Sequence, residues 1–309
     1  MKILITGGAG FIGSHVADLL IENGFDVCII DNLSSGKLEN INTKARFYKC
    51  DVRDGEILKI IEDEKPQIVI HNAAQLSVRN SVEDPANDAS INILGGLNLL
   101  EACRKLKVEK VIFASSGGVV YGEQQYFPAD ENHPTKPISP YGVAKLSFEK
   151  YLFYYNYTFG LKYTALRYAN IYGPRQDPYG EAGVVAIFSS KLLAGSQPVI
   201  NGDGKQTRDY VYVKDVAAAN LLAIKNDFTG EINIGTGIET DVNKLFDILK
   251  KSAGQKELKE VHAPAKEGEQ KRSVLSYEKA QAILGWKPKV RIIEGLNETF
   301  EWFASALKF

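Results

Sequence analysis

The sequence predicts an α/β fold: a doubly wound parallel sheet with a smaller C-terminal lobe. In the first half of the chain, short apolar runs alternate with amphipathic stretches, which is the pattern of strands joined by crossover helices. A glycine-rich turn links the first apolar run to the first amphipathic stretch. The length of 309 residues exceeds what one small core fills, so a second lobe is expected.

The predicted strands of the first half are short runs rich in Val, Ile and Phe, bounded by turns or polar residues. They comprise 2–6, 26–31, 46–50, 68–71, 111–115 and 162–167. The stretches between them repeat apolar residues at helical spacing, and they comprise 11–23, 54–65, 85–106 and 140–157. Strands connected in this way run parallel, and right-handed crossovers place helices on both faces of the sheet.

The pattern changes after Gly173, where turn residues cluster and the segments become shorter. We therefore predict a first domain over 1–173 and a second lobe over 174–309. Segments near 210–238 are expected to rejoin the first domain, because 210–213 and 231–234 are strand-like. The helices predicted in this half comprise 183–194, 214–225, 242–252, 277–284 and 294–307.

Composition excludes several classes of protein. The net charge is −1, whereas nucleic-acid binders usually carry a basic excess. The longest apolar runs fall short of the roughly 18 residues that a membrane span needs. Cys28, Cys50 and Cys103 form an odd set without CxxC spacing, and the four histidines are scattered, so neither a disulfide framework nor a metal site is predicted. The N-terminus enters a strand at once, so we expect no signal peptide and a cytoplasmic protein.

The glycine-rich turn has the spacing of a dinucleotide-binding motif. Gly7, Gly10 and Gly13 follow the first strand and open the first helix. In a Rossmann fold, the first glycine permits the sharp turn, the second lets the backbone approach a pyrophosphate, and the third lets helix pack against strand. The anion then lies at the helix N-terminus, where free N–H groups favour negative charge. The alternative is a glycine turn that merely caps a helix.

An acidic residue after the second strand strengthens the dinucleotide hypothesis. Asp31 lies about 20 residues beyond the motif, where a carboxylate accepts a hydrogen bond from the adenosine 2′-hydroxyl. A carboxylate there would repel a 2′-phosphate, so the sequence favours NAD over NADP. Asp51 and Val52, at the end of the third strand, are placed to flank the adenine.

A tyrosine and a lysine are candidates for acid–base chemistry. Tyr141 and Lys145 are four residues apart on a predicted helix, which puts both side chains on one face. A neighbouring ammonium favours phenolate, so we expect the pKa of Tyr141 to lie below its usual value of about 10 and the phenolate to act as a general base. Ser115 and Ser116 close the strand at the ligand-binding edge, where a hydroxyl could relay a proton to Tyr141. The alternatives are a surface Tyr–Lys pair and a polar strand end.

Nine segments along the whole chain carry a family resemblance. They read TGGAGFIGS at 6–14, DNLSSGKLENI at 31–41, HNAAQ at 71–75, NILGGLNLLEA at 92–102, FASSGGVVYGE at 113–123, SPYGVAK at 139–145, LRYANIYGPRQ at 166–176, GDGKQTRDYVYVKDVA at 202–217 and LGWKP at 284–288. With these segments the chain resembles the extended short-chain dehydrogenase/reductases and, among them, the UDP-glucose 4-epimerases.

The resemblance implies a cofactor site, a catalytic pair and a substrate site. Tyr141 and Lys145 match the catalytic pair. The positions that match NAD-binding residues are Gly7, Gly10, Phe11, Ile12, Gly13, Asp31, Asn32, Ser34, Gly36, Asp51, Val52, Ala73, Ala74, Asn92, Ser115, Tyr141, Lys145 and Tyr168. Those that match substrate-binding residues are Asn170 and Arg208 at the diphosphate and Val184, Val199 and Asn201 near the uridine.

Three departures from the family pattern bear on the chemistry. The family's catalytic serine is the third of SSSATVYG, and Gly117 stands there in SSGGVVYG; Ser116 or a water is then the substitute. Lys266 stands where many members place a second diphosphate-binding arginine, so it keeps the charge without the bidentate fork. Gly117–Gly118–Val119 replaces the Thr-Asp-Glu of the 4,6-dehydratases, which disfavours that reaction.

The function that the resemblance implies is interconversion of UDP-galactose and UDP-glucose by an NAD-containing homodimer, with no nucleic-acid or membrane partner. Transient oxidation at the sugar C4 would use Tyr141, Lys145 and Ser116. A UDP-glucuronate 4-epimerase or decarboxylase, or another nucleotide-sugar epimerase, remains an alternative, with Arg79 as the candidate for a C6 carboxylate. A non-catalytic NAD-sensing protein is the alternative outside enzymes.

One position bears on the size of the sugar. Counting from Lys266, the position beside the sugar 2-substituent falls on Ser273. Family members confined to glucose and galactose have a tyrosine there, whereas members that accept N-acetylhexosamines have a small residue. We therefore hypothesise that UDP-N-acetylglucosamine is also a substrate. A shift of one residue in the alignment would place the large Arg272 there instead.

Overall fold

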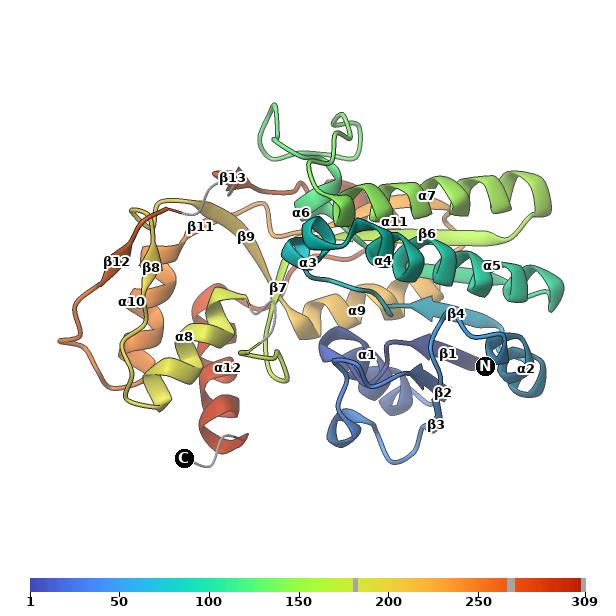
Figure 1. The fold of residues 1–309 in the computed structure, drawn as a ribbon, viewed down its shortest axis with the longest axis horizontal. Helices are drawn as coiled ribbons and strands as arrows, with labels where there is room; N and C mark the ends of the chain where they lie inside the picture. The colour runs from blue at the N-terminus through green and yellow to red at the C-terminus, as the bar shows by residue number, and fades with distance from the viewer. Residues whose placement is uncertain (180–182, 266–269, 307–309) are drawn as a thin grey trace.

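The computed structural model describes residues 1–179, 183–265 and 270–306. Its main element is a seven-stranded, wholly parallel sheet in the order β10-β6-β5-β4-β1-β2-β3 (Figure 1). The strands are β1 (Lys2–Thr6), β2 (Asp26–Asp31), β3 (Arg46–Lys49), β4 (Ile68–His71), β5 (Lys110–Ser116), β6 (Lys162–Tyr168) and β10 (Gly230–Ile234). The six strands predicted in the first half are therefore confirmed, and the expectation that 231–234 rejoins this sheet is correct.

Helices cover both faces of this sheet, as the strand–helix alternation predicted. Because side chains alternate along a strand, Ile3 and Ile5 point to one face and Leu4 to the other. The first face packs against α1 (Phe11–Glu22), α9 (Val213–Ile224) and α11 (Glu278–Leu284). The second packs against α2 (Glu56–Glu64), α5 (Gly96–Lys105) and α7 (Pro140–Phe159).

The helix expected over 85–106 is confirmed over 85–105, with a π-helical segment inside it. A short helix α3 (Val78–Glu83) precedes α4 (Pro85–Ala89), which continues through the π-helical segment η2 (Ser90–Gly95) into α5. Asp84 caps α4 by accepting a hydrogen bond from the Asn87 N–H, and Pro85 occupies the first turn, which is its favoured position. The sequence-based interpretation missed the π-helical segment because its apolar spacing differs little from that of an α-helix.

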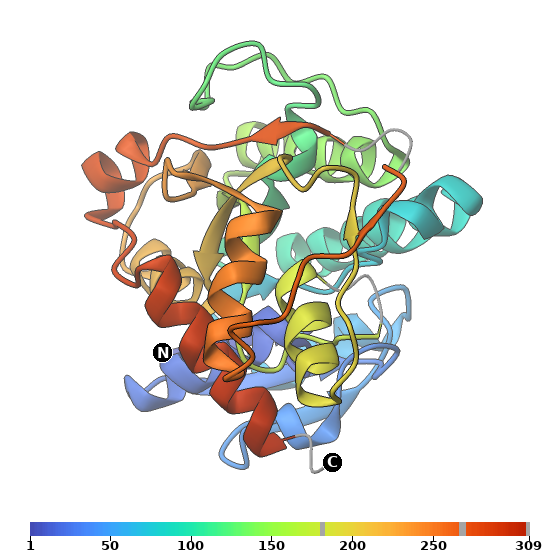
Figure 2. The same ribbon diagram turned by 90° about the vertical axis from the view of Figure 1, so that its left-hand side faces the viewer.

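The second lobe lies at the carboxyl end of the main sheet (Figure 1). One small sheet joins β7 (Asn170–Tyr172), β9 (Thr207–Tyr212), β11 (Glu239–Asp241) and β13 (Arg272–Ser273), and another pairs β8 (Ile200–Asn201) with β12 (His262–Ala263). The helices α8 (Val184–Leu193), α10 (Val242–Ser252) and α12 (Ile292–Ala306) share an apolar core and face the viewer in yellow, orange and red in Figure 2. The predicted strand at 210–213 thus belongs to the second lobe's sheet, not to the main one.

Three short helices were not predicted: α3, η1 (Leu38–Asn40) and α6 (Gly117–Val120). The α6 helix directly follows β5, so the chain turns sharply at Ser116. Across the described ranges, no helix combines the length and apolar character needed to cross a membrane. The same ranges hold no group of three or more His, Cys, Asp or Glu side chains suited to a metal ion.

Candidate active site

The glycine-rich turn packs closely against neighbouring backbone at the start of α1. Gly7 has a φ of 70°, and a Cβ at this position would lie 2.6 Å from the Ala73 nitrogen. A Cβ on Gly13 would lie 2.2 Å from the Gly7 oxygen, whereas one on Gly10 would meet only that oxygen, at 3.3 Å. Neither a capping side chain nor an acidic residue in the first turn of α1 competes for its free N–H groups. The first turn of α1 can therefore receive an anion such as a pyrophosphate.

Asp31 is held beside this turn by two backbone donors. Its Oδ2 accepts from the Ala9 N–H at 3.0 Å and its Oδ1 accepts from the Leu33 N–H at 2.8 Å. Burial raises the pKa of this carboxyl, and the two backbone hydrogen bonds partly offset that rise. A Cβ on Gly36 would lie 2.8 Å from the Asp31 Oδ1, so glycine lets the loop close over the carboxylate. Each oxygen keeps acceptor capacity for a hydroxyl.

The residues expected around the adenine are also brought together. Asn32 donates to Asp51 Oδ2 at 2.8 Å, and the Ser34 N–H donates to Asn32 Oδ1 at 2.9 Å. Arg53 forms a bidentate pair with Asp51 at 2.8 and 2.9 Å and holds the pKa of that carboxyl well below its usual range. Val52 packs on the backbone of η2 at Gly95.

The loop after β4 lies against the glycine turn. The Ala73 N–H donates to Thr6 Oγ1 at 3.3 Å, and the Ala74 main chain follows it. Asn92 is buried and fixes this loop, since its Oδ1 accepts from the Gln75 N–H and its Nδ2 donates to the Gln75 oxygen. The glycine turn, the Asp31 loop and the Ala73 loop thus border one edge of the sheet. They fit a dinucleotide with an unphosphorylated ribose.

Tyr141 and Lys145 lie on the N-terminal part of α7 at the same edge. The Lys145 Nζ donates to the Ala114 oxygen at 2.9 Å and lies 5.6 Å from the centre of the Tyr141 ring and 4.7 Å from that of Phe113. Burial lowers the pKa of Lys145 to about 8. Burial, and secondarily the charge of Asp88, raises the pKa of Tyr141. The expectation that the lysine would depress the tyrosine pKa is thus wrong, because desolvation dominates.

The two serines at the end of β5 differ in what they contact. Ser115 is buried and donates to Glu149 Oε1 at 2.6 Å, which turns its hydroxyl toward α7. Ser116 Oγ lies 3.7 Å, and Asn170 Oδ1 3.8 Å, from the point that a Cβ on Gly118 would occupy. The structure therefore brings Ser116 and Asn170 close to Gly118, at the carboxyl end of β5.

A side chain at Gly117 would require Leu275 to move. A Cβ there would lie 2.4 Å from Leu275 Cδ1 and 3.3 Å from the Arg167 oxygen. The Leu275 N–H donates to Asp209, which is buried and also accepts from Thr236 and Gly237. Leu275 thus fills the space next to the end of β5. No sequence pattern pointed to this contact, because it joins segments about 160 residues apart.

A buried ion pair behind Lys145 was also missed. Arg167 on β6 donates to both oxygens of Glu149 on α7, at 2.9 and 2.7 Å, and to the Tyr121 hydroxyl at 3.0 Å. Tyr121 in turn donates to Asn233 Oδ1 at 2.7 Å. The signal in the sequence is that Glu149 follows Lys145 by four residues and so shares its helix face.

The expected substrate-binding residues lie on the second lobe and its border. Arg208 and Ser273 face each other in register across β9 and β13, and the Arg208 Nη1 donates to the Thr207 oxygen. Ser273 is buried, whereas Arg272 points elsewhere: it forms a bidentate pair with Glu239 and lies 3.8 Å from the centre of the Phe127 ring.

The other residues expected at the substrate and cofactor sites lie on separate elements. Val184 opens α8, Val199 is exposed just before β8, and Asn201 ends β8. The Tyr168 hydroxyl accepts from Asn220 on α9, so its side chain is turned into the core rather than toward the loops that border the dinucleotide site. Lys266 lies outside the described residues.

Comparisons with known proteins agree with this geometry. The model of the NAD dependent epimerase/dehydratase family matches residues 3–235. The UDP-glucose 4-epimerase of Mycolicibacterium smegmatis is 43% identical over 309 residues, which cover 98% of each chain. Among solved structures, the UDP-glucose 4-epimerase of Thermotoga maritima with UDP-glucose has a TM-score of 0.97 and 53% identity, with 100% of both chains covered.

Two further solved structures bear on the cofactor and the sugar. The UDP-glucose 4-epimerase of Thermus thermophilus in complex with NAD has a TM-score of 0.94 and 45% identity, and the match covers 99% of this chain and 100% of that one. The UDP-N-acetylglucosamine 4-epimerase of Methanobrevibacter ruminantium, in complex with UDP-N-acetylmuramic acid, has a TM-score of 0.93 and 40% identity, with 99% of each chain covered.

Proposed function

We propose that this chain, which belongs to the NAD dependent epimerase/dehydratase family, is a UDP-glucose 4-epimerase that interconverts UDP-galactose and UDP-glucose. The observation that carries the proposal is the placement of Tyr141, Lys145 and Ser116 at the sheet edge that also holds the dinucleotide-binding turn. An open parallel sheet binds its ligands at this edge.

The residues of this edge fit NAD. The turn at Gly7 and Gly10 and the first turn of α1 would hold the pyrophosphate, and Asp31 would accept from the adenosine ribose. When bound, oxidised NAD supplies a hydride acceptor for the sugar C4 and a positive charge. Asp31 would repel a 2′-phosphate, which makes NAD the preferred cofactor.

Tyr141 is the general base of the proposed reaction. Burial keeps its phenol protonated in the free protein, so the phenolate needs nearby positive charge, which Lys145 provides below the pKa of about 8 that burial gives it. Tyr141 then takes the proton of the sugar 4-hydroxyl and later returns it. Ser116 is proposed to bridge the two oxygens, and the donation of the Ser115 hydroxyl to Glu149 supports this choice.

The substrate residues have to hold the nucleotide while the hexose turns. Arg208 and Asn170 are proposed to hold the diphosphate, with Lys266 as a second cation. Val184, Val199 and Asn201 are proposed to line the uridine site. A firmly held nucleotide and a loosely held sugar allow either face of the 4-keto sugar to be reduced.

The test is product analysis with purified protein. UDP-galactose should be converted to UDP-glucose, and denaturation should release NAD or NADH, because each cycle regenerates the cofactor. UDP-glucuronate is the comparison substrate for the alternative activity. Arg79, the candidate for a C6 carboxylate, is exposed and pairs with Glu83 one turn away, which disfavours that alternative. Retained NAD without turnover of any UDP-sugar would favour the NAD-sensing protein instead.

We also propose activity on UDP-N-acetylglucosamine. Ser273 is small and buried, and the adjacent Arg272 is held away by Glu239 and Phe127. The similarity to a UDP-N-acetylglucosamine 4-epimerase supports this extension. Ser273→Tyr should suppress N-acetyl turnover and spare UDP-galactose; equal loss of both would contradict the role of this position.

The proposed assembly is a cytoplasmic homodimer. Apolar side chains are exposed along α7 and the helices next to it, including Val143, Phe153, Tyr157 and Leu94. A concentration of exposed apolar side chains commonly marks an interface. The three cysteines are buried and unpaired, as expected in a reducing compartment.

A further inference from the structure

Asp88 is a buried carboxylate at the edge of the site that the proposed reaction does not yet use. It lies on α4 with only 1% of its surface exposed. Its Oδ1 accepts from the Gln75 Nε2 and from the Asn92 Nδ2, each at 2.9 Å. Two neutral amides thus satisfy one oxygen, and no hydrogen bond to the other oxygen is found within the described residues.

The hydrogen bonds around Asp88 tie three segments together. Asn92 on η2 exchanges two further hydrogen bonds with the main chain of Gln75, at 3.0 and 2.9 Å. The Gln75 Nε2 also donates to the Ser77 oxygen at 2.9 Å, where α3 is about to begin. The loop that carries Ala73 and Ala74 is therefore anchored on Asp88 through Gln75.

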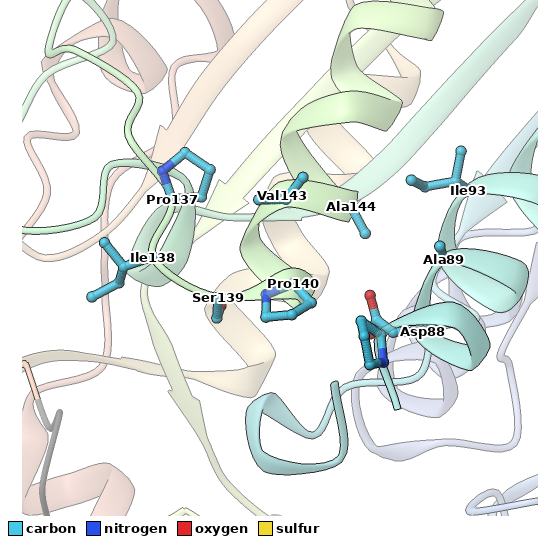
Figure 3. A pocket seen from close by; sticks show the side chains of 10 residues that line it. Asp88, Ala89, Ile93, Pro137, Ile138, Ser139, Pro140, Val143 and Ala144 are labelled. Carbon is cyan, nitrogen blue, oxygen red and sulfur yellow. The ribbon is translucent and has the colours of Figure 1, made fainter. Parts of the chain in front are cut away.

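The opposite side of Asp88 is an apolar cavity. The cavity has a volume of about 480 Å³, and Figure 3 shows Asp88, Ala89 and Ile93 facing the N-terminal part of α7 across it. The α7 residues at this cavity are Pro140, Val143 and Ala144, which bracket Tyr141 and immediately precede Lys145 in the chain.

Among the charged groups around Asp88, Lys145 is the one that bears on the proposal. Burial raises the pKa of Asp88 and the Lys145 ammonium opposes that rise; burial lowers the pKa of Lys145 and the Asp88 carboxylate opposes that fall, and the same carboxylate adds to the rise that burial causes at Tyr141. Glu149 also acts on Lys145 but is neutralised by Arg167. His71 on β4 is kept neutral by burial, which lowers its pKa to about 3.

The other charged groups nearby are exposed. On α3, Arg79 forms an ion pair with Glu83, and Asp84 caps α4. Solvent screens these charges much more than it screens a buried carboxylate.

We propose that Asp88 is a positioning residue of the active site: it fixes the loop after β4 through Gln75 and Asn92, and its carboxylate sets the pH range over which Tyr141 and Lys145 work. This role rests on the proposed epimerase function. It explains why a carboxylate is buried near the catalytic pair, although no hydrogen bond within the described residues joins Asp88 to Tyr141 or Lys145.

Asp88→Asn tests the electrostatic part of the proposal. The amide is nearly isosteric and its oxygen can still accept from Gln75 and Asn92, so the loop stays anchored. Removing the negative charge should lower the pKa of Tyr141, so that its phenolate forms more easily. It should also lower the pKa of Lys145, so that its ammonium is lost more easily. Both limbs of the kcat profile for UDP-galactose should therefore move to lower pH, by about one unit. Asp88→Ala, which also removes the charge, should move them in the same direction if the asparagine variant does not fold.

Two control variants separate charge from geometry. Asp84→Asn removes an exposed carboxylate from the same helix while keeping an N-cap residue, and its profile should superimpose on that of the wild type. Gln75→Met removes the hydrogen bond to Asp88 but leaves the charge, so it should weaken NAD retention without moving the limbs.

The outcomes distinguish this role from the proposed function. A wild-type protein that does not convert UDP-galactose would overturn the proposed function itself. With an active wild type, an Asp88→Asn profile whose limbs do not move would overturn the electrostatic role of Asp88, whether or not kcat falls. An unchanged NAD retention in Gln75→Met would overturn its anchoring role.

Discussion

At the scale of single residues, Tyr141 is the proposed general base. Tyr141→Phe removes the proton acceptor and keeps the ring, so kcat should fall by at least about 10²-fold, the usual scale of general acid–base catalysis. NAD retention and the KM for UDP-galactose should change little. Steady-state kinetics together with release of cofactor on denaturation measure both, and a variant with near-normal kcat would show that another group is the base.

We expect the loss of the Lys145 proton to set the alkaline limb of the pH profile of kcat. Burial lowers its pKa to about 8, so the ammonium is complete well below pH 8 and is lost as the pH rises through that value. Since the ammonium supports the phenolate of Tyr141, kcat should decline above about pH 8. The profile of Lys145→Met should lack this decline at its lower level of activity. A wild-type profile that keeps rising to pH 9.5 would contradict the assignment.

The two serines of β5 provide a matched comparison. Ser116→Ala should lower kcat by about 10-fold or more if its hydroxyl bridges substrate and Tyr141. Ser115→Ala removes a buried hydrogen bond to Glu149 and should lower the free energy of unfolding by about 1 kcal/mol with a smaller effect on kcat. Kinetics and urea unfolding of both variants measure the two effects. The reverse order of effects on kcat would transfer the role to Ser115.

Residues of the site differ in how far the sequence predicts them. Gly7, Gly10 and Asp31 follow from spacing because the glycine turn and the carboxylate beside it belong to one continuous strand–helix–strand unit. Asp88 and Leu275 do not, because their partners lie in other segments and only the packed fold brings them together. The pKa of Tyr141 was predicted with the wrong sign for the free protein, since spacing on a helix says nothing about burial.

At the scale of elements, the link between α7 and β6 is a buried ion pair. Arg167→Met leaves the Glu149 carboxylate buried without its cation and should cost about 3–5 kcal/mol of unfolding free energy. Replacing both partners, as in Glu149→Leu with Arg167→Met, should recover much of this loss, because neither charge is then desolvated alone. Urea denaturation of the two single variants and the double variant measures the coupling, and additive losses would rule it out.

The elements themselves were predicted well where periodicity is strong and poorly where it is interrupted. The strands of the main sheet and most long helices follow from apolar spacing over at least one full element. The π-helical segment η2 left no such signal, because its apolar spacing differs little from that of an α-helix. The short strands of the second lobe have two or three residues and leave no periodic signal.

At the scale of the whole molecule, the apolar face of α7 and η2 should determine assembly. Leu94 is 61% exposed on this face, and Leu38 is 62% exposed on the distant η1. Leu94→Glu places a charge in the proposed interface, where desolvation is costly, and should shift the protein from dimer to monomer. Leu38→Glu makes the same chemical change at the same exposure and should leave the mass unchanged.

Light scattering during size-exclusion chromatography measures the mass of each variant. A partner copy on this face would also cover the cavity beside Asp88, which Val143 and Ile93 line. Dissociation should then hydrate the carboxylate and weaken its effect on Lys145 and Tyr141. We therefore expect monomeric Leu94→Glu to show a kcat profile moved toward lower pH, in the same direction as Asp88→Asn. A wild type that is monomeric at micromolar concentration, or a dimeric Leu94→Glu, would contradict the assignment of this face.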